Sequence, residues 1–199
     1  MKPVAWIAAI VLLGSVSAPA QDARRFNGGA KEFENLVGAF FLFDRGGNER
    51  VTVDYALYSG RFGIMLYSPT EAGPFSGNTE FLAELFAGPI FYGPGDFAGG
   101  GSLLLRYNFF RPGARVVPYV QGGGGFVYTD IEPGEASSNA VSTEFNFNLQ
   151  ATFGIRWILN DRWSFLTEAT YRHISNAGLS DPNYGIDQAG GSVGVGFSF

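Results

Sequence analysis

The stretch that decides the fold is residues 144–159, which read EFNFNLQATFGIRWIL. From Phe145 to Leu159 the odd positions are apolar, whereas most even positions carry Asn, Gln, Thr or Arg. Alternation with a period of two is typical of a β-strand that has one apolar and one polar face. Strands of soluble proteins are usually about 5–6 residues long, whereas a tilted strand needs about 9–11 residues to cross a membrane. The segment therefore predicts a transmembrane β-strand.

The same alternation recurs along the chain and predicts which residues face inward. In a small membrane barrel the apolar face meets lipid and the polar face fills the interior. We therefore expect Val51, Val53, Tyr55 and Leu57 on the lipid side. A buried charge needs a partner, so the charged residues of the polar faces are expected to pair inside the barrel. These residues are Asp54, Glu84, Arg106, Arg156, Glu168 and Arg172.

About eight strands are predicted, which favours an all-β, eight-stranded antiparallel outer-membrane barrel. Their ranges are 35–44, 50–67, 79–92, 98–110, 115–129, 142–159, 162–175 and 187–199, and Ser59-Gly60 could break the second. Turn-forming residues separate them at 45–48, 93–95, 112–113 and 160–161. The chain ends on Phe199, which resembles the terminal strand of bacterial outer-membrane barrels. The alternative is a soluble β-sandwich.

The N-terminus reads as a secretory signal over residues 1–20. Lys2 supplies the positive charge, Val4 to Leu13 the apolar run, and Ala18-Pro19-Ala20 the small residues before a cleavage site. Residues 21–199 are then one barrel domain. Because the apolar run is shorter than the ~20 residues of a spanning helix, we expect an exported chain in the outer membrane of a Gram-negative bacterium, and not a helical membrane protein.

Composition excludes several function classes. The chain has no cysteine and one histidine, which excludes disulfides, thiolate metal sites and histidine-rich metal sites. Its formal net charge of −5, without a basic run, argues against nucleic acid as a partner. No metal or organic cofactor is implied.

The single histidine, His173, lies two residues from Ser175 near the end of a predicted strand. Residues spaced i, i+2 on a strand leave the same face, with their Cα atoms ~6.6 Å apart. The imidazole could then take the hydroxyl proton, as nucleophilic catalysis by serine requires. Parity places both residues, and Asp187 at the start of the last strand, on the outer wall. We therefore predict a Ser175–His173–Asp187 triad there.

Residues 173–179, His-Ile-Ser-Asn-Ala-Gly-Leu, and residues 182–187, Pro-Asn-Tyr-Gly-Ile-Asp, resemble the signature of a known family. That family is the outer-membrane lipid A 3-O-deacylases, the PagL-type acyloxyacyl hydrolases, and the resemblance covers roughly the last thirty residues. It implies that Ser175 is the nucleophile, His173 the general base and Asp187 the orienting acid. It also implies an oxyanion hole built from the Asn176 side chain and the Gly178 N–H. Asp187 departs from the glutamate of the family.

The resemblance implies lipid A in the outer leaflet as the substrate, with release of a fatty acid from its 3-O-linked ester. Two alternatives remain open at this point. One is an outer-membrane phospholipase-type esterase that uses the same three residues, and the other is a structural or adhesive barrel without catalytic activity. For adhesion the candidate loops are 68–79, 130–142 and 176–186. The sequence is compatible with a monomer and with a homodimer.

Overall fold

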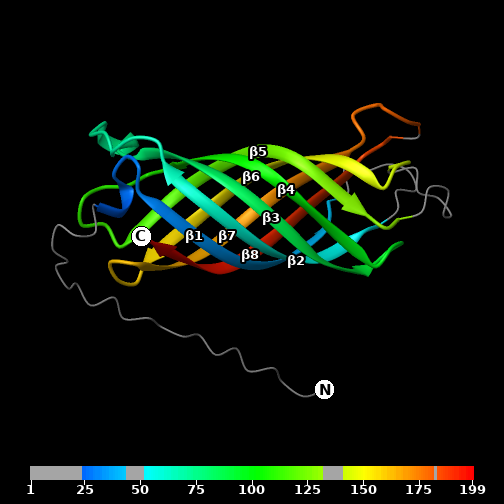
Figure 1. Cartoon of the computed structure of the whole chain (residues 1–199), viewed down its shortest axis with the longest axis horizontal. Coiled ribbons are helices and arrows are strands. Elements are labelled where there is room, and N and C mark those ends of the chain that lie inside the picture. The colour runs from blue at the N-terminus through cyan, green and yellow to red at the C-terminus, as the bar shows by residue number, and fades with distance from the viewer. Residues whose placement is uncertain (1–23, 44–51, 132–140, 182) are drawn as a thin grey trace, which may run out of the picture.

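The computed structural model describes residues 24–43, 52–131, 141–181 and 183–199. These residues form a closed antiparallel barrel in which consecutive strands pair and β1 pairs with β8 (Figure 1). The strands are β1 (Lys31–Leu42), β2 (Asp54–Met65), β3 (Asn78–Tyr92), β4 (Phe97–Asn108), β5 (Val116–Thr129), β6 (Phe145–Ile158), β7 (Trp163–Ser175) and β8 (Ile186–Ser198). The predicted eight-stranded barrel is confirmed. The signal segment 1–20 and the turn 45–48 lie outside the described residues.

The strand register defines the two ends of the barrel. We call the end that carries Lys31 and Ser198 the terminal end, because β1 begins and β8 finishes there. The opposite, distal end carries the β7–β8 connection, residues 176–185. The β2–β3 connection lies at the terminal end and contains the short helix η2 (Gly73–Phe75). The candidate loops 68–79 and 176–186 therefore lie at opposite ends, while 132–140 of the third candidate lies outside the described residues.

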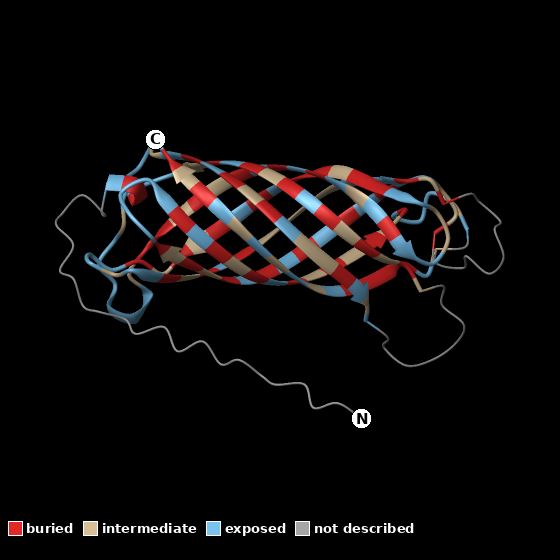
Figure 2. Ribbon diagram, turned by 90° about the horizontal axis from the view of Figure 1, so that it is seen from below, coloured by how far each residue is buried: buried red, intermediate tan, exposed pale blue. Residues whose placement is uncertain are grey.

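Burial alternates along the strands as the sequence pattern predicts (Figure 2). In β6, Asn146, Asn148 and Gln150 are buried, whereas Phe147 and Leu149 are exposed. Since apolar side chains face outward over most of the wall, the surface suits lipid rather than water. A second three-residue helix, η1 (Arg24–Phe26), precedes β1. Within the described ranges, no helix is long and apolar enough to span a membrane.

Charged side chains inside the barrel neutralise one another. Arg61 lies 2.6 Å from a carboxylate oxygen of Glu168 and 2.8 Å from one of Glu84. Arg106 donates two hydrogen bonds to the Glu34 carboxylate, at 2.6 and 2.8 Å. Because each arginine meets carboxylates directly, the buried charges keep partners in place of water. Five of the six predicted interior charges are indeed buried: Glu84, Arg106, Arg156, Glu168 and Arg172.

The first half of β2 corrects the prediction. Val53, Tyr55 and Leu57 are buried inside the barrel, with 2–3% of their surface exposed, and do not face lipid. Asp54 lies instead on the opposite face, where its Oδ1 accepts the Leu42 N–H at 2.9 Å. The reason is that an apolar cluster fills the distal end of the interior, so the inward face is apolar there. The cluster comprises Phe40, Val53, Tyr55, Leu57, Phe86, Ile90, Ala98, Val127, Ile131, Val141, Ile174 and Ile186.

The strand β2 is continuous, and Ser59-Gly60 does not break it. Ser59 pairs with Leu36 on β1 and with Phe86 on β3, so both edges of the strand stay bonded at this point. The glycine-rich part of β5 allows close approach of neighbouring backbones. A Cβ on Gly125 would sit 1.9 Å from the Gly101 carbonyl oxygen, which no side chain tolerates.

Candidate active site

His173 on β7 and Asp187 on β8 lie directly opposite each other in the antiparallel register. His173 Nδ1 lies 2.8 Å from Asp187 Oδ1, within hydrogen-bond distance. The two side chains leave the outer face of the barrel, yet the Asp187 side chain is only 5% exposed and that of His173 is 35% exposed. The hydrogen bond to Asp187 assigns the proton of the neutral imidazole to Nδ1, which leaves Nε2 as the acceptor.

Asp187 has a second donor on the same face. The hydroxyl of Tyr171 donates to Asp187 Oδ1, the oxygen that also contacts His173. The Tyr171 ring meets the edge of the Phe43 ring at a centroid distance of 6.4 Å and 89° between planes. Phe43 in turn donates its backbone N–H to the Asp187 carbonyl oxygen at 2.8 Å. Parity with His173 predicts Tyr171 on the outward, lipid-facing wall, but sequence reasoning did not predict its hydrogen bond to Asp187.

Ser175 is the last residue of β7, on the outer face with His173, and is half-buried. Its neighbour across the ladder on β6 is Phe147. Among the described residues, the ring of His173 is hydrogen-bonded to Asp187 and not to Ser175. The structure thus joins two of the three predicted residues by a hydrogen bond and places the third beside them. In unliganded sites, catalytic hydrogen bonds are often long and tighten only with substrate.

The chain after Ser175 is held by the buried side chain of Asn176. Its Nδ2 donates to the Ser180 carbonyl oxygen at 2.7 Å and to Ser142 Oγ at 3.1 Å. Its Oδ1 accepts the Gly178 N–H at 2.9 Å. Both predicted oxyanion donors therefore lie in one network next to Ser175, and their N–H groups are bonded within the β7–β8 connection and to Ser142.

Gly185 lies against the imidazole from the loop side. Its φ of +74° is in the left-handed region, and a Cβ there would sit 2.7 Å from His173 Cε1. The imidazole is thus confined between the Asp187 carboxylate at Nδ1 and the Gly185 backbone near Cε1. Sequence reasoning quoted Gly185 only within a motif and gave it no role.

The sequence model of the family described as lipid A 3-O-deacylase (PagL) matches residues 52–196, almost three quarters of the chain. The chain belongs to the PagL family. The predicted outer-membrane lipid A deacylase, an ester hydrolase, is thereby confirmed. No curated protein matches the chain.

Solved structures support the fold of this PagL-family chain. The outer membrane enzyme PagL shares 17% identity at a TM-score of 0.51, covering 82% of this chain and 97% of that one. Neisserial surface protein A shares 12% identity at a TM-score of 0.55, covering 85% and 97%. The N-terminal β-barrel domain of Pseudomonas aeruginosa OprF shares 17% identity at a TM-score of 0.52, covering 86% and 98%. At these identities the likeness shows a common outer-membrane barrel fold.

The outer wall of this PagL-family barrel carries a groove along the strands of the candidate site. It holds about 510 Å³ between β1, β7 and β8. Gly191 in this groove pairs with Ala39 on β1 and with Ala169 on β7, two outward positions along the strands from the His173–Asp187 pair. Because these side chains are small, the wall is hollowed here, about 13 Å along the strands from the His173–Asp187 pair toward the terminal end.

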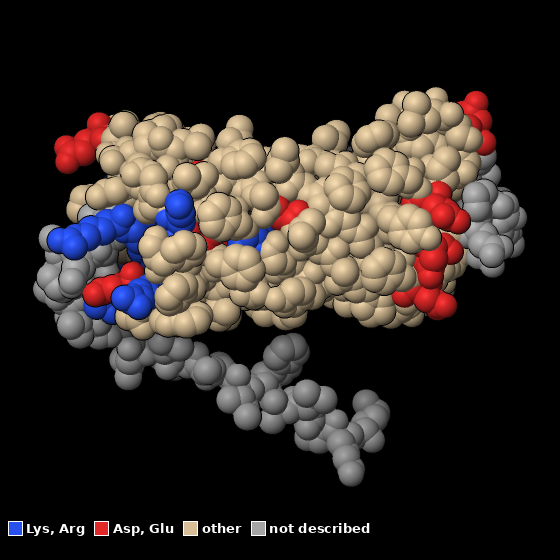
Figure 3. All heavy atoms as spheres, in the orientation of Figure 1, with Lys and Arg blue, Asp and Glu red and all other residues tan. Residues whose placement is uncertain are grey.

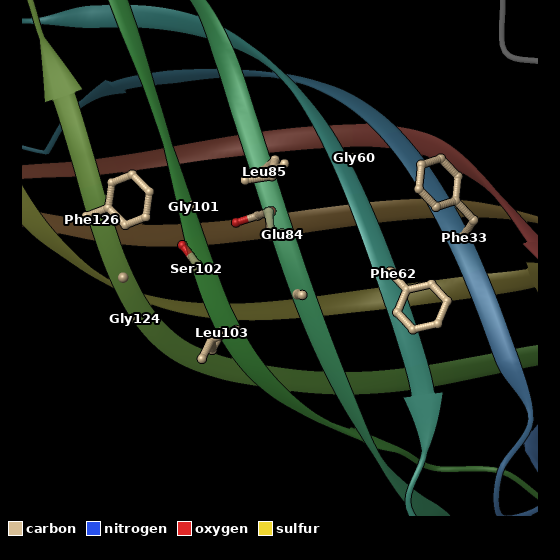
Figure 4. Close-up of a pocket in the computed structure, with 12 residues that line it drawn as sticks. Phe33, Gly60, Phe62, Glu84, Leu85, Gly101, Ser102, Leu103, Gly124 and Phe126 are labelled. Atoms are coloured by element: carbon tan, nitrogen blue, oxygen red, sulfur yellow. The ribbon is translucent and has the colours of Figure 1, made fainter.

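A larger groove lies elsewhere on the wall. It holds about 680 Å³ and is lined by residues of β1 to β5, including Phe33, Gly60, Phe62, Leu85, Gly101, Gly124 and Phe126 (Figure 4). No residue that lines it belongs to β6, β7 or β8, so it is separate from the candidate triad.

Proposed function

We propose that this PagL-family deacylase cleaves the 3-O-linked acyl ester of lipid A with a Ser175–His173–Asp187 triad. The observation that carries the proposal is the hydrogen bond between His173 and Asp187 on the outer wall, with Ser175 on the same face. A histidine with a carboxylate at Nδ1 and a free Nε2 is the arrangement that activates a serine. The apolar wall around it would admit acyl chains without removing them from the bilayer.

The reaction runs in two halves. In the first, Ser175 Oγ attacks the ester carbonyl carbon while His173 Nε2 takes the hydroxyl proton. The tetrahedral intermediate collapses, the bond from the carbonyl carbon to the sugar oxygen breaks, and His173 returns the proton to that oxygen. In the second half, water attacks the acyl-serine, His173 takes a proton from the water, and the fatty acid leaves as Ser175 regains its hydrogen. Asp187 stabilises the imidazolium formed in each half.

Asn176 and Gly178 are proposed as the donors to the oxyanion. Each donor of this kind typically lowers the barrier by ~3–4 kcal/mol. To act, the Gly178 N–H has to exchange its bond to Asn176 Oδ1 for one to the substrate oxygen. Support for this role comes from position, since both residues directly follow Ser175 at the end of β7.

The proposed substrate site also requires that the distal end faces the outside of the cell. The chain then enters and leaves the barrel on the periplasmic side, and the triad meets the outer leaflet, where lipid A resides. We propose that residues 1–20 direct export and are removed. The intact mass of protein purified from outer membranes tests this, since it should correspond to a chain that begins at Gln21.

Mass spectrometry of lipid A from a Gram-negative host that makes the protein tests the triad. Wild type should remove one 3-O-linked acyl chain, whereas Ser175→Ala and His173→Ala should not. Ser180→Ala is a matched control, because it removes a hydroxyl from the same connection and keeps the carbonyl oxygen that Asn176 uses. Full deacylation by Ser175→Ala, with all variants folded in the outer membrane, would exclude the serine mechanism.

A further inference from the structure

Within the part of the chain that the structure describes, two side chains contact Asp187 at one oxygen, on a wall that faces lipid. His173 Nδ1 and the Tyr171 hydroxyl both contact its Oδ1 atom. Only 3% of the residue is exposed, so water has little access to this carboxylate. A carboxylate removed from water needs donors to remain charged, and bonds of this charge-assisted kind are strong. The Tyr171 hydroxyl therefore replaces one of the hydrogen bonds that water would otherwise donate to the carboxylate.

The strand register of the barrel brings the Tyr171 hydroxyl within reach of Asp187 Oδ1. Tyr171 and His173 lie two residues apart on β7, and Asp187 faces His173 across the ladder. Tyr171 faces Ala189, the outward residue that follows Asp187 on β8. The contact from Tyr171 to Asp187 is thus diagonal, over ~7–8 Å between Cα atoms, which a tyrosine can span. The small side chain of Ala189 leaves room for the ring to lean toward Asp187.

The aromatic ring is itself held in place. Its edge contact with Phe43 joins β7 to the end of β1, and the Phe43 N–H is bonded to the backbone of Asp187. A tyrosine loses little freedom when its ring is packed, so its hydroxyl is a fixed donor. Two donors at the same carboxylate oxygen fix its orientation more closely than either donor alone, and Tyr171 and His173 meet at Oδ1 in this way.

We propose that Tyr171 is a positioning residue for catalysis, whose hydroxyl holds Asp187 Oδ1 against His173 Nδ1. This inference rests on the proposed triad. It predicts that Tyr171 acts through Asp187 and makes no bond to the reacting ester. The imidazole is then fixed with Nε2 available to Ser175, as the mechanism requires. On β6 the cross-strand neighbour of His173 is Leu149, whose apolar side chain cannot replace the Tyr171 hydroxyl as a donor to Asp187.

Tyr171→Phe tests the proposal, because it removes the hydroxyl and keeps the ring that packs on Phe43. We expect kcat to fall roughly ten- to hundredfold, the effect of losing one hydrogen bond to a charged group, with KM nearly unchanged. The acid limb of the kcat/KM profile should move to lower pH, because an imidazolium with a misplaced carboxylate is less stable. Tyr58→Phe is the matched control, since Tyr58 is also an outward tyrosine and donates to Asn35 on a neighbouring strand away from the site.

A double-mutant cycle separates positioning from a direct role. If Tyr171 acts through Asp187, Tyr171→Phe should have no further effect on kcat in an Asp187→Ala background. Additive losses would overturn the proposal, as would a rise in KM alone or an unchanged kcat and pH profile in the single variant. Wild-type-like kinetics in Tyr58→Phe would show that the effect is specific to the site.

Nuclear magnetic resonance distinguishes failure of this inference from failure of the triad. The chain has one histidine, so its Nδ1 proton gives one signal that reports the bond to Asp187. Tyr171→Phe should move this signal upfield even in a Ser175→Ala background that has no activity. A signal that does not move would overturn the positioning role. Activity retained by Ser175→Ala would instead overturn the proposed function.

Discussion

At the scale of single residues, Gly185 shows how a backbone position can limit the side chain of a proposed catalytic residue. Its left-handed conformation brings the backbone so close to the imidazole that no Cβ fits. Together with the Asp187 bond, this contact restricts His173 to one orientation on an otherwise open wall. A substitution here should therefore affect activity more than stability.

Gly185→Ala is expected to lower kcat at least tenfold, because the new methyl group displaces the imidazole from Asp187. The left-handed conformation itself costs an alanine ~1–2 kcal/mol of stability. Gly113→Ala is the control, because Gly113 also has a left-handed backbone, with φ +81°, and nothing lies within 4 Å of an added Cβ. It should lose a similar amount of stability and leave kcat unchanged. Kinetics and thermal unfolding of both variants provide the check, and equal losses of kcat would contradict the contact model.

At this scale the sequence predicts only the features of the site that follow from strand parity and strand register. The outward faces of Ser175, His173 and Asp187 follow from the alternation of period two, and the antiparallel hairpin brings the last two together. The diagonal bond from Tyr171 could not be predicted, because parity specifies the face of the strand that a side chain leaves and not the direction in which it tilts along that face. The partners of Asn176 depend on a loop whose path the sequence pattern does not specify.

At the scale of the strands, the polar interior is the feature that links elements on opposite sides of the barrel. Arg61 on β2 contacts Glu84 on the neighbouring β3 and also Glu168 on β7. Since β7 carries His173 and Ser175 on its outer face, the strand that bears two residues of the proposed triad outside is held by ion pairs of Glu168 inside.

Arg61→Ala should lower the free energy of unfolding by about 3–5 kcal/mol, because it leaves buried carboxylates without their partner. Arg115→Ala, which removes an exposed arginine at the terminal end, should change it by less than about 1 kcal/mol. Urea unfolding of the barrel in detergent or vesicles measures both. Equal stability of the two variants would show that the interior charges do not act as a network.

A second element-scale prediction concerns the distal connection between β3 and β4. Two backbone N–H groups, of Phe97 and Asp96, donate to Asp130 Oδ1 at 2.9 Å each and lower the pKa of that carboxyl. Because the folded pKa lies below the unfolded value, the stabilisation is present above ~pH 4 and is lost as the pH falls through the folded value. As the pH falls, the hydrogen-exchange rate of these two amides in wild type should rise relative to the exchange rate of a reference amide. In Asp130→Asn the ratio of the two exchange rates should not change with pH in this way, because the side chain does not titrate.

Strand existence was more predictable than strand orientation. The alternation of β3, β4, β6 and β7 assigned the correct faces, because charged or amide side chains mark the inward positions there, and apolar side chains mark the outward positions of β8. In the first half of β2 the apolar face points inward and Asp54 lies on the outward face, since Tyr55 and Leu57 belong to the distal apolar cluster. Periodicity defines two faces, and only the surrounding strands decide which one is inside.

At the scale of the whole molecule, charge and apolar surface are divided along the barrel. Lysine and arginine side chains gather at the terminal end, where acidic side chains also lie, whereas the described surface of the distal end shows acidic side chains in this view (Figure 3). Among the described residues, the acidic ones at the distal end that are not buried are Asp54, Asp96, Asp130, Glu144 and Asp181. The described part of this end offers no Lys or Arg to the phosphates of lipid A, so the proposed substrate site is expected to rely mainly on the apolar wall.

The two grooves of that wall allow a test of this idea with a single kind of substitution. Ala39 lines the groove between β1, β7 and β8, and Ala83 lines the larger groove over β1 to β5. Ala39→Phe should raise KM several-fold, or shift the preferred acyl chain toward shorter lengths, because the ring fills the hollow that lies along the strands from the proposed site. Ala83→Phe adds the same ring to the same outward face and should leave deacylation unchanged. Lipid A analysis over time in vesicles measures both, and equal inhibition by the two variants would mean that the whole outer wall, rather than the groove at β7 and β8, receives the substrate.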